Sequence, residues 1–346
     1  MRRRDACRFE GNRRRGLTEP GFPRQPPHPP FCRIRMFVSL IIPTFNRAAL
    51  LREALESARR QSDYILEVIV CDDGSTDDTP RVCLEFDSPA TPVVLSRSET
   101  NQGAQVARNR GLAMARGEFI LFLDSDDILA DGGLAPFLTA LRNDPALEFV
   151  HGRVTRTDSD LAPLAGQPHV GAAFGPDPLE IAGYHWHTAG ALYRKSLLKR
   201  VGGWNEALTG SQDWEYQARV KIAGGRGRFI DHTLAMWREH GGNRVGALKF
   251  RKDYVRSVVL ACTSIHKAAG LAGIVDTSLS RRLCRKTLLH ALEFGAHGCR
   301  AERNWALDQA GSLALRSPLA RGLITLWRIM PPAADRAAWN AVQRRP

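Results

Sequence analysis

Short apolar runs alternate with helix-spaced apolar patterns between residues 37 and 157. The runs have the length of buried strands, and most end in Pro, Asp or Ser. The predicted strands are 37–43, 67–71, 93–96, 119–123 and 149–154. Strands that alternate with helices of 10–15 residues form βαβ units. The pattern therefore predicts an α/β fold with a doubly wound, mostly parallel sheet.

Two of the intervening helices have informative faces. The first is expected to run to about Arg60, with Asn46 as its N-cap. The helix that follows Asn101 is expected to end at Ala115, and it carries small residues at helical spacing, including Gly111. Such a face lets a helix lie close to a sheet. A further helix is predicted at about 133–142.

Acidic residues follow the strand at 119–123 directly, at Asp124, Asp126 and Asp127. Open α/β sheets bind ligands at the carboxyl ends of their strands. Asp124 and Asp126 are two residues apart at such an end, so both can reach one hard cation. Carboxylates suit Mg²⁺ or Mn²⁺, which commonly also bind substrate phosphates. The alternative is a solvated acidic turn that caps the next helix.

The strand at 67–71 also ends in acids, Asp72 and Asp73. Carboxylates at neighbouring strand ends converge on one cleft, which repels a bare anion but suits a phosphate ligand that arrives with a metal. No glycine-rich phosphate loop follows the first strand. This counts against a dinucleotide enzyme and against a Walker-type ATPase.

The formal charge of +13 lies at the two ends of the 346-residue chain. Residues 1–35 contain ten Arg and three acids, and residues 246–346 contain seventeen Lys or Arg and six acids. Residues 36–245 have a net charge of −5. A phosphate-rich partner or an anionic membrane would therefore meet the flanks. The seven cysteines show no paired spacing, which favours reduced thiols in a cytoplasm.

Three regions follow from this distribution. Residues 1–35 are Arg- and Pro-rich without an apolar core, so we expect a disordered tail that lies upstream of the true start or is dispensable. Residues 36–245 form the α/β domain. Residues 246–346 carry helical apolar stripes, of which the clearest contains Val258, Cys262 and Ile265. These helices are expected to pack on the α/β domain; a basic face resting at the inner face of an anionic membrane is the alternative.

Four blocks carry a family resemblance. PTFNR at 43–47, CDDGSTDDT at 71–79, NQGAQVARNRG at 101–111 and FLDSDD at 122–127 resemble, in order and spacing, the blocks of family 2 glycosyltransferases. These are inverting enzymes of GT-A fold, and the resemblance covers roughly 38–244. It implies a nucleotide-sugar donor, with Asp73 at the base, Asp124 in a DxD motif and Asp126 as the metal ligand. Thr44, Asn46 and Asn101 fall in donor-pocket blocks without firm roles, and both Asn residues are alternatively helix caps.

Two later segments extend the resemblance. The family commonly has an acidic pair where this chain has Gln212-Asp213, and its second member is the general base, so Asp213 keeps that role and Gln212 departs from it. The alternative is a helix that begins with negative charge. WREHGGN at 237–243 resembles the closing block, which implies His240 near the metal or, equally, a cap or loop role. The patch at 184–187, YHWH, was open to packing, acceptor contact or metal binding.

The combined interpretation is a metal-dependent, inverting glycosyltransferase that moves a sugar from a nucleotide-sugar donor to a saccharide or lipid-linked acceptor in cell-surface polysaccharide or glycolipid synthesis. Asp73, Asp126 and Asp213 would then line one pocket. The alternatives are a GT-A nucleotidyltransferase, which normally has a basic, glycine-rich first loop, and a non-enzymatic protein that binds polyanions or an anionic membrane. We expect no nucleic acid partner, because the basic flanks lack interleaved aromatic residues.

Overall fold

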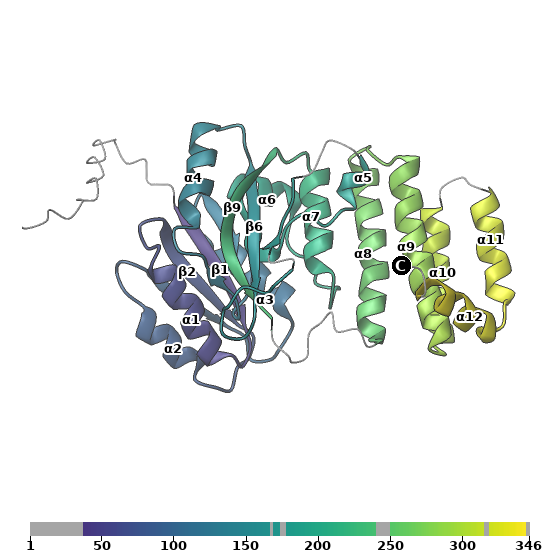
Figure 1. The fold of residues 1–346 in the computed structure, drawn as a ribbon, viewed down its shortest axis with the longest axis horizontal. Helices are drawn as coiled ribbons and strands as arrows, with labels where there is room; N and C mark the ends of the chain where they lie inside the picture. Colours follow the sequence, from purple (N-terminus) through teal and green to yellow (C-terminus); the bar gives the residue numbers. More distant parts are fainter. Residues whose placement is uncertain (1–36, 167–168, 174–177, 240–249, 315–317, 344–346) are drawn as a thin grey trace, which may run out of the picture. The chain divides into compact units, whose positions relative to one another are not determined.

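The computed structural model describes residues 37–166, 169–173, 178–239, 250–314 and 318–343 (Figure 1). The predicted tail at 1–35 lies outside these ranges. The first half of the described chain builds a parallel sheet. Its strands stand in the order β3-β2-β1-β4, and all three pairings are parallel. Their bounds are β1 Val38–Thr44, β2 Ile65–Asp72, β3 Val93–Arg97 and β4 Phe119–Phe122.

The sheet continues beyond β4 with strands of mixed direction. The order is β4-β8-β6-β9-β5, with β8 antiparallel to both of its neighbours and β9 parallel to β6. The bounds are β5 Ile128–Leu129, β6 Phe149–Thr157, β7 His169–Val170, β8 Ala191–Arg194 and β9 Gly227–Arg238. The expected strand at 149–154 is part of β6. Strands β8 and β9 are not among the predicted strands: β8 has only four residues, and most residues of β9 are exposed or half-buried.

Helices cover both faces of the sheet, as a doubly wound fold requires (Figure 1). On β1, Leu40 and Ile42 pack in a cluster with α1 and α4, whereas Ile41 packs in a second cluster with α3, α6 and α7. The α/β fold class is therefore confirmed. The bounds are α1 Ala48–Arg59, α2 Thr79–Phe86, α3 Ala104–Met114, α4 Leu134–Asn143, α5 Pro178–Ile181, η1 Thr188–Gly190, α6 Lys195–Val201 and α7 Gln212–Ile222.

Helix α3 lies very close to the sheet, and Gly111 makes this approach possible. A Cβ atom at Gly111 would lie 2.5 Å from Cγ2 of Ile41 and 2.8 Å from Sγ of Cys71. Because real Cβ atoms do not approach neighbours so closely, any larger residue would push α3 outward. The prediction that small residues bring this helix onto the sheet is confirmed.

The C-terminal region is helical and packs on α7. Trp214 and Ala218 of α7 share one apolar cluster with Val258, Cys262 and Ile265 of α8, the stripe predicted from the sequence. The hydroxyl of Ser264 on α8 donates to Glu215 of α7 at 2.6 Å. No helix in the described ranges is long and apolar enough to cross a membrane. The bounds are α8 Lys252–Leu271, α9 Thr277–Ala296, α10 Arg300–Leu313, α11 Pro318–Ile329 and α12 Pro332–Gln343.

Candidate active site

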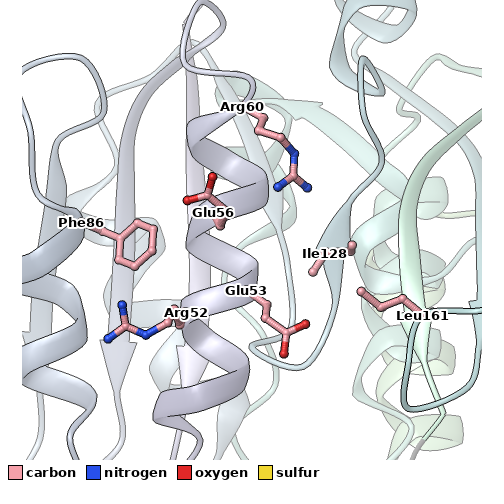
Figure 2. Close-up of a pocket in the computed structure, with 7 residues that line it drawn as sticks. All are labelled: Arg52, Glu53, Glu56, Arg60, Phe86, Ile128 and Leu161. Carbon is pink, nitrogen blue, oxygen red and sulfur yellow. The ribbon is translucent and has the colours of Figure 1, made fainter.

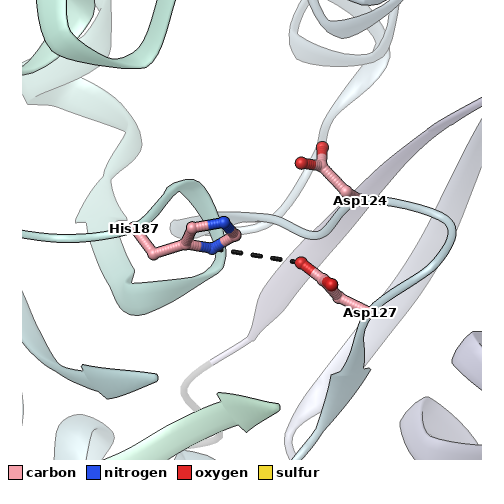
Figure 3. Close-up of side chains that lie close together, drawn as sticks. All are labelled: Asp124, Asp127 and His187. Atoms are coloured by element: carbon pink, nitrogen blue, oxygen red, sulfur yellow. Dashed lines mark ion pairs between the residues drawn. The ribbon is translucent and has the colours of Figure 1, made fainter. Parts of the chain in front are cut away.

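Two acids and one histidine gather where β4 runs into its loop. Ligand atoms of Asp124, Asp127 and His187 all lie within 4.8 Å of one another (Figure 3). His187 is the N-cap of the short 3-10 helix η1, which leads into β8, and β8 pairs with β4. This pairing brings a histidine and the acidic loop together although they are far apart in the sequence.

The surroundings of Asp127 and His187 fit a missing positive charge. Asp127 is 1% exposed, and its Oδ2 accepts no hydrogen bond from the described residues. Nδ1 of His187 lies 3.9 Å from this oxygen and accepts the N–H of Ala189 at 3.3 Å instead. Burial and the charges of Asp124 and Asp126 raise the pKa of Asp127 well above its ordinary value.

A neutral imidazole completes the cluster. Burial lowers the pKa of His187, although the charges of Asp124 and Asp213 oppose that shift. Neutral imidazole and carboxylate oxygens are metal ligands, and a bound cation would satisfy the orphaned oxygen of Asp127. The residues present therefore fit a divalent cation.

Arg108 of α3 joins the acidic loop to helix α7. Its Nη2 donates to Oδ1 of Asp124 at 2.5 Å, and its Nη1 donates to Oε1 of Gln212 at 3.1 Å. The guanidinium also lies over the ring of Trp204, 4.6 Å from its centroid. Burial raises the pKa of Asp124, but the charges of Arg108, His187 and Arg47 and the hydrogen bond from Arg108 together lower it overall. The sequence interpretation did not include Arg108, although it lies within the NQGAQVARNRG block.

Asp213 stands in the first turn of α7, beside Gln212. Its Oδ1 accepts the N–H of Trp214 at 2.8 Å. The Gln212 side chain is held from both ends, because its Nε2 also donates to Oε1 of Gln105 at 2.8 Å. Through Gln212 and Arg108, the turn that carries Asp213 is tied to Asp124, and the charge of Asp213 also acts on His187. A chain of side-chain hydrogen bonds therefore connects the turn of Asp213 to the acidic loop.

Asp73 binds the backbone at the start of α3. Its Oδ2 accepts the N–H groups of Gln102 and Gly103 at 2.9 and 2.6 Å. Asp73 also contacts β1 and α3: its backbone N–H donates to the carbonyl of Thr44 at 2.9 Å, and its Oδ1 lies 3.6 Å from Nη1 of Arg110. Thr44, at the carboxyl end of β1, is 4% exposed, and its hydroxyl has no hydrogen-bond partner among the described residues.

The capping alternatives for Asn46 and Asn101 are wrong. Asn46 has a left-handed backbone with φ of 51°, and its Oδ1 accepts the N–H of Thr76 at 2.8 Å, across the loop. Arg47 occupies the N-cap position of α1, where the N–H of Ala48 donates to Asp77 from another loop. Asn101 is exposed and precedes α3, whose N-cap is Gly103.

Of the two residues predicted to hold the metal, Asp126 lies in the described part of the chain and is paired with an arginine. Oδ2 of Asp126 forms an ion pair with Nη1 of Arg47 at 2.5 Å, and its carbonyl accepts a hydrogen bond from Arg238 at 3.2 Å. Asp126 is not among the three clustered ligands. His240 lies outside the described residues, so its predicted role stays a prediction.

The aromatic patch at 184–187 divides by position. Trp186 is fully buried and donates to the hydroxyl of Tyr193 at 2.7 Å, which is core packing. His185 lies 3.0 Å from the carboxylate of Glu180, and His187 faces the acidic loop. Tyr184 is 43% exposed and can still contact an acceptor. The sequence suggested no third ligand near these histidines, because Asp124 and Asp127 approach only in the folded chain.

A separate cavity of about 440 Å³ lies along α1 (Figure 2). It is lined by Arg52, Glu53, Glu56, Arg60, Phe86, Ile128 and Leu161. None of the candidate site residues lines it, and its charged side chains are already paired within the protein, as in the Arg52–Glu85 and Arg60–Asp131 contacts. The cavity is therefore distinct from the candidate site.

Comparisons with known proteins give a consistent result. A family model described as Glycosyl transferase family 2 matches residues 39–202. A PGL/p-HBAD biosynthesis glycosyltransferase of Mycobacterium bovis is 30% identical over 207 residues, which cover 59% of this chain and 77% of that protein. A GalNAc(5)-diNAcBac-PP-undecaprenol beta-1,3-glucosyltransferase of Campylobacter jejuni is 42% identical over 103 residues, covering 29% of this chain and only 33% of its own length.

Among solved structures, S. aureus TarS 1–349 in complex with UDP-GlcNAc has a TM-score of 0.65 at 20% identity, covering 89% of this chain and 92% of that one. This likeness extends beyond the sequence match and includes part of the C-terminal helices, since 89% of the chain exceeds the α/β region. It supports the fold, and the sequence matches support the family. The chain belongs to glycosyl transferase family 2.

Proposed function

We propose that this protein is an inverting, metal-dependent glycosyltransferase that transfers a sugar from a nucleotide-sugar donor to an acceptor hydroxyl. The observation that carries the proposal is the link from Asp124 through Arg108 to Gln212, which holds the turn of Asp213 beside the acidic loop. Single-displacement transfer needs a carboxylate base and a site for the donor diphosphate in one place. Family membership speaks against both the nucleotidyltransferase and the non-enzymatic alternatives.

Asp213 is the proposed general base. As the acceptor oxygen attacks the anomeric carbon, the bond from that carbon to the diphosphate oxygen breaks on the opposite face, and the acceptor proton passes to the carboxylate. Oδ1 of Asp213 accepts the N–H of Trp214, and the Tyr184 side chain also interacts with this carboxylate. Gln212 cannot serve, because an amide does not usefully accept a proton. Configuration inverts because no covalent sugar–enzyme stage intervenes.

Asp124, Asp127 and His187 are the residues in the described part of the chain that would hold Mg²⁺ or Mn²⁺, and Asp126 is placed to join them if it leaves Arg47. When bound, the cation neutralises charge on the departing diphosphate. Arg108 keeps the carboxylate of Asp124 ionised and oriented. Burial of His187 keeps its imidazole neutral, the form that binds a metal.

The substrate classes are inferred from relatives. The TarS structure contains UDP-GlcNAc, and the Campylobacter relative is named for a lipid-linked diphosphate acceptor. We infer a nucleoside diphosphate sugar as donor and a saccharide or lipid-linked acceptor, in the synthesis of a glycolipid or a cell-surface polysaccharide. A cytoplasmic reaction is supported by the five described cysteines, all free thiols.

The first test is a thermal-shift screen of nucleotide sugars with and without Mn²⁺. A true donor at 100 times its Kd stabilises the folded state by about 2.7 kcal/mol. The donor found is then used in a transfer assay. Asp213→Asn is expected to lower turnover by about 10²- to 10⁴-fold while donor binding persists.

A matched control is Asp253→Asn, which changes an exposed acid in the first turn of α8, outside the site. It should leave turnover unchanged. Wild-type turnover in Asp213→Asn would remove the base assignment, and a screen in which no nucleotide sugar shifts the melting temperature would remove the proposed function.

A further inference from the structure

An exposed apolar ridge runs along the end of α11, far in sequence from the candidate site. Leu326, Ile329 and Met330 are 60%, 80% and 47% exposed. Leu326 and Ile329 are three residues apart and lie on one face of the helix, and Met330 is the first residue after its end. Ile324 of the same helix is 4% exposed and packs in the helical core. Helix α11 is therefore apolar both toward the protein and toward solvent.

A basic pocket adjoins this ridge. It has a volume of about 220 Å³, and Met330 belongs to both the ridge and the pocket wall. The lining residues are Gly295, Arg300, Arg303, Asn304, Arg328, Met330 and Asp335. Three arginines and one aspartate give the lining a net charge of +2. The wall thus combines positive charge with an apolar rim.

The three arginines are not equivalent. Arg303 is 5% exposed and forms a buried ion pair with Asp335 at 2.6 Å, so it supports the fold of the pocket. Arg328 is paired with Asp308 at the surface. Arg300 is exposed and forms no ion pair with the residues that the structure describes. Arg300, which is exposed, and Arg328, whose ion pair lies at the surface, are therefore the two cations that an outside anion can reach.

We propose that this face docks on an anionic phospholipid bilayer. The ridge of Leu326, Ile329 and Met330 enters the boundary between headgroups and acyl chains, and Arg300 and Arg328 meet lipid phosphates. The inference goes beyond sugar transfer, which uses none of these residues. Charge complementarity carries it: Arg300 and Arg328 line the pocket beside the ridge, and the sequence of residues 300–346, with eight Arg and three acids, has a net charge of +5.

The same features argue against other occupants. A second copy of this chain would bring a like-charged face, and three apolar side chains are few beside the roughly 800 Å² per partner of a stable interface. A soluble polyanion would satisfy the arginines but leave the ridge in water. Only an anionic bilayer presents phosphates and apolar chains at adjacent depths.

The test measures co-sedimentation of the full-length protein with vesicles. Vesicles of phosphatidylcholine alone are compared with vesicles that contain about 30% phosphatidylglycerol. We expect binding to the anionic vesicles that weakens as salt rises. The double change Ile329→Ser with Met330→Ser should lower the partition constant by about tenfold or more. The double change Arg300→Gln with Arg328→Gln should lower it on anionic vesicles only.

Two matched controls distinguish binding through this face from nonspecific binding through any exposed apolar or basic side chain. Leu271→Ser changes an 83% exposed leucine at the end of α8, and Arg81→Gln changes an exposed arginine of α2. Both should bind vesicles like the unmodified protein, and thermal unfolding confirms that every variant is folded. Transfer to a soluble acceptor should be unchanged in the ridge variants, so failure of this inference is distinguishable from failure of the proposed function.

Three results would overturn the proposal. One is the absence of binding to anionic vesicles by the unmodified protein. Another is an equal loss of binding in Leu271→Ser. The third is a ridge variant that converts a dimer to a monomer in sedimentation velocity while vesicle binding persists, which would make a second copy the occupant.

Discussion

Arg108 is the residue whose removal tests the architecture of the site most directly. Its guanidinium joins Asp124 on the acidic loop to Gln212 on the helix of the proposed base. Arg108→Met removes the charge and both hydrogen bonds while keeping an unbranched side chain over Trp204. Asp124→Asn removes the partner charge with little change in shape. The two changes, made singly and together, form a double-mutant cycle.

The size of the effect follows from burial. The Arg108 side chain is 7% exposed, but that of Asp124 is 31% exposed, so the pair lies between a buried and a surface ion pair. Hydrogen bonds to charged groups contribute about 1.5–3 kcal/mol, whereas exposed ion pairs contribute about 0.2–1 kcal/mol. We expect a coupling free energy of about 1–2 kcal/mol. Arg108→Met alone should cost about 2–3 kcal/mol, because the bond to Gln212 is lost as well.

The assay is urea unfolding of the four proteins at pH 7 and low salt, which gives the free energy of unfolding of each. The ion pair of Arg81 with Asp78 on α2 serves as control, because both side chains are more than 60% exposed. Its coupling should be much smaller, because solvent screens an exposed pair. A coupling at Arg108–Asp124 no larger than that of the control would refute the claim that this contact holds the site together.

Three further outcomes are expected. Gly111→Ala should destabilise the fold by about 1–3 kcal/mol in urea unfolding, because the new methyl group meets Ile41 and Cys71. The control is Gly311→Ala on α10, which has open space around it and should stabilise the fold by about 0.5–1 kcal/mol. Burial raises the pKa of Glu67, but hydrogen bonds from Ser39 and Arg116 bring it below the ordinary 4.5. The carboxylate therefore stabilises the fold fully above pH 4.5, and this stabilisation is lost as the pH falls through the pKa of the folded protein. The unfolding free energy of Glu67→Gln should fall less steeply below pH 4.5 than that of the unmodified protein. Asp126→Ala should weaken Mn²⁺-dependent donor binding by about tenfold in calorimetric titration, and equal affinity with and without Mn²⁺ in both proteins would contradict a metal role.

The parallel half of the fold was predictable because its strands are buried on both faces. Burial of every residue in β1 and β4 leaves an apolar run that shows in the sequence. Strand β9 has no such run; its extended form is stabilised by a long parallel pairing with β6, a contact that local sequence does not encode. Strand β8 is four residues long and is defined by its two neighbours.

The candidate site divides in the same way. The acids at 124–127 were predictable from their position at a strand end, and Asp213 from family resemblance. The closeness of His187 to Asp127 depends on β8 returning beside β4, and the role of Arg108 depends on how closely α3 lies on the sheet. For Asn46 the local sequence predicted a helix cap that the fold does not contain, because Asp77 from another loop accepts the N–H of Ala48 instead.

Helix α7 has a consequence for how this protein can be divided. One side of it carries Asp213, and the other contributes Trp214 and Ala218 to the core of the C-terminal helices, while Ser257 of α8 bonds the backbone of Gly210 just ahead of the helix. A chain shortened after residue 245 would expose the apolar face of the helix that carries the proposed base. If C-terminal regions were exchanged between related enzymes, the residues of α7 that pack on those helices, such as Trp214 and Ala218, would therefore have to be exchanged with them.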